Sequence, residues 1–444
     1  LNINSNNLNS LDLSANVSLE ILAIGINPIT AIDVTDKPEL TEFYAYGTNL
    51  TNIDLSSNSK LTLIDIADNA NLTSLNIKNG NNTNLATVRI LNNTNLTCIT
   101  ADSANLDTSN WSKDADLNLQ TDCNTSSNVT TIPDSNFEQA LIDLGWDTNG
   151  LNGNILTTEA QAIDSLKIGN PVTNDSIPNV AAKIKSIVGV AAMTNLTYLN
   201  LRDNEISEVD LSVNTNLEYV DFSRNQFTTI DLSQNAQLIS LQLSDNALTT
   251  LDISSLTELQ TINIGRNQLT AVDFSSNTKL ETLYANTTGL NSLDISSLPN
   301  LVRLQAVQNN LTSIDFSNNV SLEYILVQEN NITALDVSNN TNLIQISAYQ
   351  NQIASIDVSS NINLQYLWLG GNSNDLSGST ETNTISSLDV SNNTKLINII
   401  VAGLNLSTID VSQNTDLSLL NINSNNLNSL DLSANVSLEI LAIG

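Results

Sequence analysis

The chain contains no histidine and only two cysteines among its 444 residues. The side chains that most often act as general acids, bases and nucleophiles are therefore absent or scarce. No glycine-rich loop leads from a strand pattern into a helix pattern. Acidic pairs recur at fixed intervals, which a repeat fold explains without catalysis. We therefore expect a protein that is not an enzyme.

Basic residues are also scarce. Fourteen lysines and arginines stand against 46 acidic residues, for a net charge of −32. Binding to phosphate backbones or anionic membrane surfaces needs clustered positive charge, so we expect no nucleic-acid partner. No apolar run approaches the roughly 20 residues that a membrane helix needs, so we expect no membrane insertion.

One stretch of the sequence occurs twice. Residues 1–25 (LNINSNNLNSLDLSANVSLEILAIG) recur without change as residues 420–444, an offset of 419 residues. Divergent copies would not stay identical over such a length. The chain is therefore interpreted as a window on a longer array of 419-residue units, with residues 1–123 ending one unit and 124–444 forming most of the next. A designed or artificially joined repeat protein is the alternative.

Apolar residues recur every 21 residues over most of the chain, as in Leu238-x-x-Leu241-x-Leu243-x-x-Asn246-x-Leu248. A short fixed period of this kind is typical of solenoids. The first strand residues of successive copies are expected at Leu1, Leu22, Phe43, Ile64, Val88, Leu199, Val220, Leu241, Ile262, Leu283, Leu304, Ile325, Ile346, Leu367, Ile399, Leu420 and Leu441. Eleven additional residues near 371–381 predict a protruding loop.

This pattern resembles the leucine-rich repeat, in which each copy supplies one short strand and the strands stack in parallel on a concave face. The resemblance implies a solenoid with leucines pointing inward. The asparagine at the ninth position is expected to bond backbone groups of neighbouring turns. These residues are Asn204, Asn225, Asn246, Asn267, Asn309, Asn330 and Asn351. Thr48, Thr288 and Leu404 interrupt the series and predict local irregularity.

An aligned aspartate follows in the second half of each copy. The series comprises Asp210, Asp231, Asp252, Asp273, Asp294, Asp315, Asp336 and Asp357. We expect each carboxylate to cap a turn through its own backbone, as Asx turns do. A ladder of bound cations is the alternative, because stacked carboxylates repel one another.

Two special segments interrupt the repeats between residues 97 and 195. Residues 98–123 are interpreted as a C-terminal cap that ends one array (residues 1–97), closed by a disulfide between Cys98 and Cys123. That bond predicts an oxidising, extracellular compartment, with reduced thiols as the alternative. Residues 124–130 form a polar linker. Residues 131–195 predict a helical N-terminal cap, with helices starting near Ser135 and Thr157, ahead of the second array (residues 196–444).

The paired segments IPDSNFEQALIDLG and NLTCITAD…NWS…DC resemble those of leucine-rich-repeat surface proteins of flavobacteria and other Bacteroidota. This resemblance implies a secreted protein displayed on the cell surface, commonly through the type IX route, with a role in adhesion. It also implies O-glycans at aspartate–serine–apolar motifs, here at Ser103, Ser165 and Ser176.

A metal-like pattern lies between the two expected helices. Asp147, Asn149, Asn152 and Glu159 follow the order of oxygen ligands in calcium loops, with one extra residue before Asn152. The sequence therefore predicts a possible Ca²⁺ site, the only cofactor expected. A plain asparagine–glycine turn is the alternative.

The tyrosines and arginines fall at or beside outward-facing strand positions. Large exposed side chains from adjacent strands suggest a binding surface, although they could simply cover the sheet. The expected concave patch comprises Tyr324, Leu326, Tyr349, Tyr366, Trp368 and Ile400.

Together these features predict an extracellular structural protein, either a filament or a giant tandem-repeat surface protein, whose partners are identical units. The alternative is a cell-surface adhesin module that binds a protein or a glycan. The duplicated segment favours the first interpretation and the concave patch favours the second.

Overall fold

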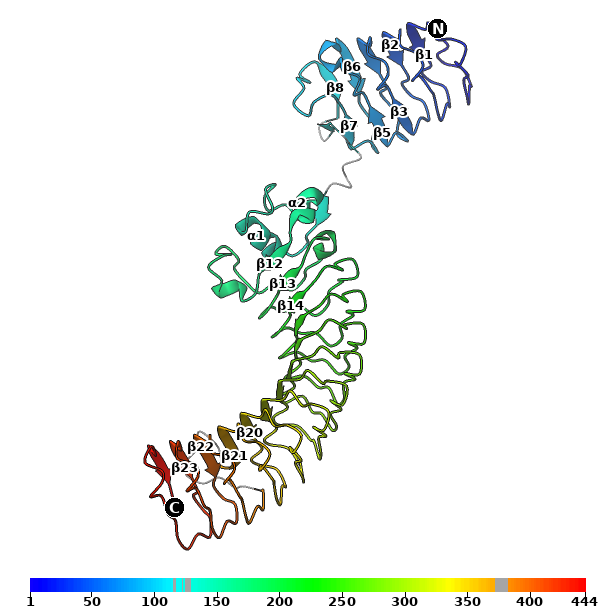
Figure 1. The fold of residues 1–444 in the computed structure, drawn as a ribbon. Helices are drawn as coiled ribbons and strands as arrows, with labels where there is room; N and C mark the ends of the chain where they lie inside the picture. Colours follow the sequence, from blue (N-terminus) through cyan, green and yellow to red (C-terminus); the bar gives the residue numbers. More distant parts are fainter. Residues whose placement is uncertain (115–116, 122, 124–128, 372–381) are drawn as a thin grey trace. The chain divides into compact units, whose positions relative to one another are not determined.

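The computed structural model describes residues 1–114, 117–121, 123, 129–371 and 382–444 (Figure 1). The chain divides into two compact units, residues 1–128 and 129–444, which are described separately. Most of the predicted loop at 371–381 and of the predicted linker at 124–130 lies outside the described residues.

Unit 1 is a solenoid with strands on two sides. Its first sheet is parallel and five-stranded, formed by β1 (Ile21–Ala23), β2 (Glu42–Tyr44), β4 (Leu63–Asp65), β6 (Thr87–Ile90) and β8 (Trp111–Lys113). A second parallel sheet contains β3 (Asn52–Asp54), β5 (Ser74–Asn76), β7 (Cys98–Thr100) and β9 (Asn118–Gln120). The chain alternates between the sheets and encloses one apolar core. A 3-10 turn, η1 (Asn82–Asn84), precedes β6.

Unit 2 is built on one parallel sheet of thirteen strands in sequence order, which lines the inner side of its curve in Figure 1. The strands are β12 (Ser165–Lys167), β13 (Tyr198–Asn200), β14 (Tyr219–Asp221), β15 (Ser240–Gln242), β16 (Thr261–Asn263), β17 (Thr282–Tyr284), β18 (Arg303–Gln305), β19 (Tyr324–Leu326), β20 (Gln345–Ser347), β21 (Tyr366–Gly370), β22 (Asn398–Val401), β23 (Leu419–Asn421) and β24 (Ile440–Ala442).

The register follows the sequence period. Leu241 pairs with Val220 on one side and Ile262 on the other, so equivalent residues of successive turns face each other. The strands with a predicted first residue begin one residue before it. Backbone pairing starts at the residue ahead of the inward side chain. Leu241, Leu243 and Leu248 are fully buried, as the repeat pattern predicted. Full burial of a leucine stabilises the fold by about 2 kcal/mol relative to exposure.

The predicted asparagine ladder is confirmed. In a representative turn, Asn267 Nδ2 donates to Ile264 O of its own turn (2.9 Å) and to Leu243 O of the previous turn (3.0 Å). Its Oδ1 accepts the Leu248 N–H at 3.0 Å. The amide therefore saturates backbone groups that the loop leaves unpaired.

A column of left-handed residues accompanies this ladder. From Asn204 to Asn351, the residue before each ladder position has a positive φ angle, although none of these residues is glycine. These residues are Asp203, Arg224, Asp245, Arg266, Thr287, Gln308, Glu329 and Gln350, with φ between 50° and 59°. Such a conformation costs roughly 1–2 kcal/mol for an L-residue. The hydrogen bonds of the asparagine that follows compensate for that cost.

Irregularity appears at Thr288, as predicted. Its hydroxyl donates to Ala285 O at 2.6 Å in place of the missing amide. Asn309 Oδ1 then accepts three backbone N–H groups, from Thr288, Gly289 and Leu290. Gly289 has φ +92°, which a residue with a side chain rarely adopts.

A second buried asparagine series was not foreseen. Asn319 Nδ2 donates to Ile295 O and Leu298 O of the preceding turn at 2.9 and 2.8 Å, while its Oδ1 is buried without a hydrogen-bond partner in the described chain. The full series is Asn58, Asn214, Asn235, Asn277, Asn319, Asn340, Asn361, Asn393, Asn414 and Asn435. The recurrence of these residues in the sequence could have identified them. Lys37, Leu256 and Leu298 occupy equivalent positions and are fully buried.

The cap segments contribute strands, which the sequence interpretation missed. Strand β8 continues the first sheet of unit 1, and β12 starts the sheet of unit 2. The N-terminal cap contains α1 (Ser135–Asp143), α2 (Thr157–Ala162) and the 3-10 turns η3 (Pro171–Thr173) and η4 (Val190–Ala192). An antiparallel pair of strands, β10 (Val129–Thr131) and β11 (Asn154–Leu156), brings the start of the cap forward into the predicted linker. These three-residue strands are defined by backbone pairing and not by the leucine pattern, so the repeat period did not predict them.

Candidate functional site

Side chains on the solvent-facing, concave side of the thirteen-stranded sheet form the candidate site. Tyr324 and Leu326 on β19, and Tyr366 and Trp368 on β21, are all partly exposed there. Arg303, on the adjacent β18, places its guanidinium carbon 3.7 Å from the centroid of the Tyr324 ring. We call these five residues the concave patch.

Internal contacts hold the aromatic side chains of the concave patch in place. The rings of Tyr366 and Trp368 meet edge to face with centroids 6.4 Å apart. Trp368 Nε1 donates to Asn398 Oδ1 on β22 at 3.1 Å. Because these rotamers are already fixed, little conformational entropy would be lost when a partner binds.

Two residues predicted for this patch are not exposed. Tyr349 is 7% exposed and Ile400 is 1% exposed, so the expectation of accessible side chains is wrong at both positions. A Cβ atom added at Gly371 would lie 3.7 Å from Ile400 Cγ2, so the chain leaving β21 covers this isoleucine.

A second aromatic cluster lies at the other end of the sheet. Tyr198 and Tyr219 stack with ring centroids 4.3 Å apart, and Lys167 Nζ lies 5.1 Å from the Tyr198 centroid. Burial, followed by the charge of Asp221, raises the pKa of Tyr219 to about 12. Tyr219 therefore stays neutral at physiological pH. The two tyrosines occupy the same position in adjacent repeat copies. That recurrence is the sequence signal from which this pair could have been found.

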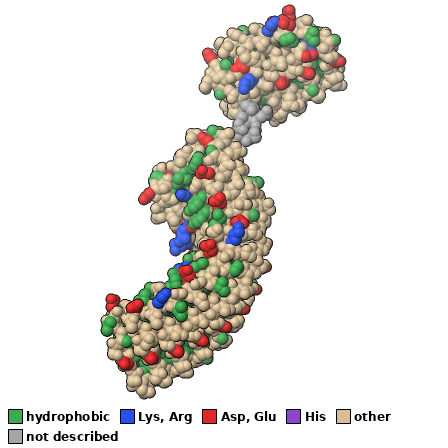
Figure 2. All heavy atoms as spheres, in the orientation of Figure 1, with side chains coloured by type: hydrophobic (Ala, Val, Ile, Leu, Met, Phe, Trp, Pro, Cys, Tyr) green, Lys and Arg blue, Asp and Glu red, His purple; other side chains and the backbone are tan. Residues whose placement is uncertain are grey.

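Charge is distributed unevenly over unit 2. Lys167, Arg202 and Arg303 lie on or beside the strands, and basic side chains gather along the inner edge in Figure 2. The repeated aspartates lie in the second half of each turn.

The repeated aspartates form Asx turns, as expected. Asp315 Oδ1, for example, accepts the Ser317 N–H at 2.9 Å. The hydrogen bonds from this serine lower the pKa of Asp315, whereas the neighbouring carboxylates of Asp336 and Asp294 oppose the effect. The same serine bond recurs throughout the series.

The predicted calcium-loop residues lie between α1 and α2. Asp147 is buried, and its Oδ1 accepts the Asn149 N–H at 3.1 Å. Asn152 Nδ2 donates to Asn149 Oδ1 at 2.7 Å, and Thr148 donates through its hydroxyl and backbone to Glu159. Over the described ranges, no group of three or more acidic, cysteine or histidine side chains is arranged to hold a metal ion.

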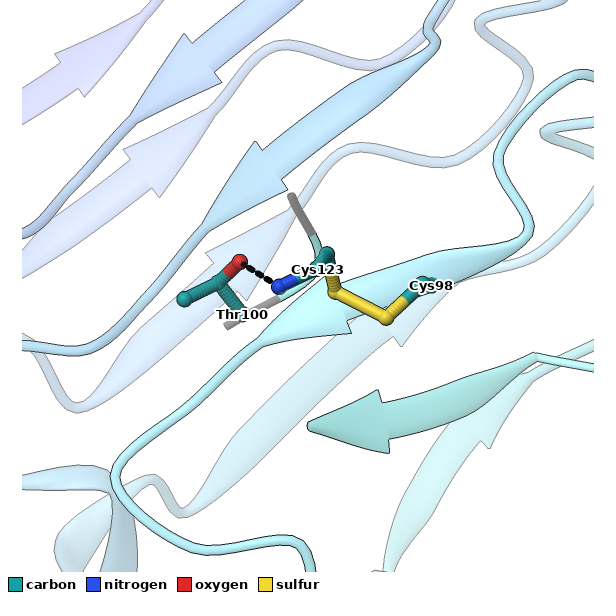
Figure 3. The surroundings of a disulfide bond; sticks show 3 residues. All are labelled: Cys98, Thr100 and Cys123. Carbon is teal, nitrogen blue, oxygen red and sulfur yellow. Dashed lines mark hydrogen bonds between the residues drawn. A yellow bond between two sulfur atoms is a disulfide. The ribbon is translucent and has the colours of Figure 1, made fainter. Parts of the chain in front are cut away.

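The predicted disulfide is present. Cys98 on β7 is bonded to Cys123, and the Cys123 N–H donates to Thr100 Oγ1 at 3.0 Å (Figure 3). The bond closes the end of the unit 1 solenoid over Ile99 and Leu117, which are buried.

The serines expected to carry glycans have different surroundings. Ser176 is exposed in a turn, Ser165 is partly buried on β12, and Ser103 accepts the Asn105 N–H through its hydroxyl oxygen. Among the helices that the structure describes, none is long and apolar enough to span a membrane.

Comparison with known proteins agrees with this architecture. A family model described as leucine-rich repeats (2 copies) matches residues 194–234. The functional domain of InlJ from Listeria monocytogenes, which includes a cysteine ladder, is 26% identical, with 71% of this chain and 75% of that chain covered and a TM-score of 0.52. This chain has only two cysteines, so it cannot form a comparable ladder.

Two further structures share the fold. An internalin (InlF) from Listeria monocytogenes is 23% identical, with 70% of this chain and 95% of that chain covered and a TM-score of 0.59. A leucine-rich-repeat protein of Leptospira interrogans is 19% identical, with coverage of 98% and 95% and a TM-score of 0.56. No curated protein matches the chain. The fold is therefore a leucine-rich-repeat solenoid with internalin-like neighbours.

Proposed function

We propose that unit 2 is a protein-binding module of an extracellular or cell-surface protein, and that the concave patch is its contact surface. The Arg303–Tyr324 stack beside Tyr366 and Trp368 carries this proposal. Arginine, tyrosine and tryptophan are the residues that dominate binding energy at protein interfaces. Here they stand on strands of a rigid sheet rather than on loops.

The composition of the concave patch favours a protein partner over other classes. Its apolar rings and Leu326 can be desolvated, while the Arg303 guanidinium can pair with a carboxylate or carbonyl oxygen of the partner. A glycan would use the same aromatic faces, but it would gain less from the arginine and from Leu326.

The proposal can be tested without a known partner. Peptides would be selected from a displayed random library against the full chain. The enriched peptides should lose roughly tenfold or more in affinity for a Tyr324→Ala/Trp368→Ala variant. A Val320→Ala/Ile362→Ala variant is the matched control, because both residues are exposed in turns outside the strands, at 52% and 56%. Equal peptide affinity for the patch variant and the wild type would refute the proposal.

A second proposal concerns assembly. The identity of residues 1–25 with residues 420–444 favours identical units repeated every 419 residues, in a filament or a giant tandem surface protein. The disulfide favours secretion, because such bonds persist in oxidising compartments. Each 419-residue repeat would then present one concave patch, so the array would be multivalent.

Electron microscopy of native material tests the array. Regularly spaced, identical curved segments are expected along each particle. In light scattering, a monodisperse, monomeric 444-residue polypeptide that unfolds cooperatively would favour the single binding module instead.

A further inference from the structure

Three carboxylates border the loop between α1 and α2 in the N-terminal cap. Glu138 comes from α1, Asp147 from the loop that follows, and Glu159 from α2. Glu138 and Asp147 are 2% and 4% exposed. Among the described residues, no lysine or arginine forms an ion pair with any of the three. Buried negative charge of this kind normally requires a compensating positive charge.

Glu138 already has a structural role. One of its carboxylate oxygens, Oε1, accepts the backbone N–H groups of Asn152, Gly153 and Asn154 at 2.8, 2.6 and 3.0 Å. These bonds fold the second half of the loop around the end of the carboxylate. The loop is therefore held in shape by Glu138 before any ligand arrives.

Asp147 is not satisfied in the same way. Its Oδ1 accepts the Asn149 N–H, but its Oδ2 is buried and has no hydrogen-bond partner in the described chain. An ionised carboxylate oxygen left in this state is costly unless a cation approaches it.

The loop also accommodates its additional residue. Gly150 and Gly153 have φ angles of +87° and +85°, so the chain turns sharply twice between Asp147 and the start of β11. A calcium loop normally needs one such turn. The second turn takes up the extra residue and leaves Asn149, Asn152 and Glu159 in the ligand order of the pattern.

We propose that this loop binds one Ca²⁺ ion through Asp147 Oδ2 and the carboxylate of Glu159, with amide oxygens of Asn149 and Asn152 completing the protein ligands. Two carboxylates with neutral oxygens suit Ca²⁺, which accepts six to eight oxygen ligands. This set needs only two acidic side chains, and no group of three is arranged around a metal position in the described chain.

The ion would tie together α1, the loop and α2. Phe137 and Leu141 on α1 pack into the same apolar core as Leu166 on β12, so the cap covers the first turns of unit 2. Affinities of about 10⁻⁴ to 10⁻³ M are usual for extracellular calcium modules. The cap would then be fully stabilised only outside the cell. The inference is independent of the concave patch.

Terbium luminescence of the full chain tests the site. Tb³⁺ replaces Ca²⁺ at oxygen sites, and Trp146, adjacent to Asp147 in the chain, would sensitise its emission. Emission should appear on adding Tb³⁺ and disappear when Ca²⁺ is added. Asp147→Asn should weaken Ca²⁺ binding by roughly tenfold or more. Asp175→Asn, the same charge change at an exposed position of the cap, should leave binding unchanged.

Several outcomes would overturn the proposal. These are no sensitised emission, emission that Ca²⁺ does not displace, or equal Ca²⁺ affinity in the wild type and Asp147→Asn. Equal affinity would mean that Ca²⁺ binds to the exposed aspartate series and not to this loop. If Asp147→Asn does not fold, Glu159→Gln replaces it with the same expected loss. Wild-type melting with Ca²⁺ or with a chelator is the second readout, and an identical melting temperature would also reject the site.

Discussion

Asn330 donates from its side-chain amide to the carbonyl oxygen of Ala306, 24 residues earlier, at 2.8 Å. The same amide bonds Val327 O at 3.0 Å, and its oxygen accepts the Leu311 N–H at 3.2 Å. One side chain therefore joins two successive turns and compensates for the left-handed residue before it. This relationship recurs along the first ladder and motivates the first prediction.

The two asparagine ladders should differ in their contribution to stability. Asn330→Leu leaves backbone groups of two turns unpaired and should lower the free energy of unfolding by about 3 kcal/mol. Asn319→Leu removes two donated bonds and a buried oxygen that has no partner in the described chain, but the acceptors Ile295 O and Leu298 O keep backbone N–H bonds from Leu298 and Leu301. The sequence itself has leucine at equivalent positions 256 and 298. We expect a loss of about 1 kcal/mol or less there. Urea denaturation of both variants measures the difference, and equal losses would contradict it.

Reduction of the Cys98–Cys123 disulfide should destabilise unit 1 alone. The bond spans a sequence separation of 25 residues, and opening a loop of this length costs about 3 kcal/mol in the chain-entropy model. Unit 2 is a separate compact unit, so its unfolding should not change. Calorimetry with and without reductant measures both transitions. A Cys98→Ser/Cys123→Ser variant serves as the control, and it should melt like the reduced wild type.

Acid should destabilise the solenoid through the aspartate series. The hydrogen bonds from the following serine lower the pKa of each carboxyl below its usual value of 3.8, as at Asp252, Asp273 and Asp315. A carboxyl whose pKa falls on folding stabilises the fold above that value, and the stabilisation is lost as pH drops through the lower, folded-state pKa. The melting temperature should therefore decrease below about pH 4.

Replacing carboxylates in this series should flatten that profile. An Asp252→Asn/Asp273→Asn/Asp315→Asn variant keeps the side-chain oxygen that accepts the serine N–H, but it cannot titrate. Its melting temperature should fall less between pH 5 and pH 2 than that of the wild type. Parallel curves from circular dichroism would show that these aspartates do not control acid stability.

Asp134 should be more important than an ordinary helix cap. Its Oδ1 accepts the N–H groups of Asn136 and Phe137 at the start of α1, and its Oδ2 accepts those of Lys185 and Ser186 at 2.7 and 3.0 Å. Asp134→Ala should cost about 1 kcal/mol for the cap plus a similar amount for the second pair of bonds. Thermal melts of unit 2 measure the loss. Asp175→Ala is the exposed control, and a loss no greater than that of the control would refute this double role.

The repeat architecture could be predicted because each turn contacts mainly its neighbours. The residue pattern of the repeat is visible in the sequence. It predicts the inward positions of Leu241 and Leu248 and the hydrogen bonds of Asn267. The disulfide was predictable because the chain has only two cysteines. The second asparagine series was equally periodic, but its bonds run to the preceding turn in a part of the repeat whose conformation the pattern does not specify.

The candidate sites were less predictable because they depend on contacts between distant segments. Tyr349 lies two residues beyond the end of β20, and Ile400 lies on β22, yet both side chains are buried. Glu138 carried no sequence signal for its role, because its three backbone partners lie 14 to 16 residues further along the chain. The same holds for Asp134, whose second pair of bonds reaches residues 51 and 52 positions away.

By itself, the sequence determined the turn length, the apolar core positions and the first asparagine ladder, because local periodicity and residue chemistry act within one turn or between adjacent turns. Only the tertiary structure decided that unit 1 has two sheets whereas unit 2 has one long sheet, which aromatic side chains remain exposed, and that Asp147 Oδ2 is buried without a partner in the described chain. Exposure and hydrogen bonding depend on every segment that folds over a residue, and a 21-residue period contains no information on insertions or caps.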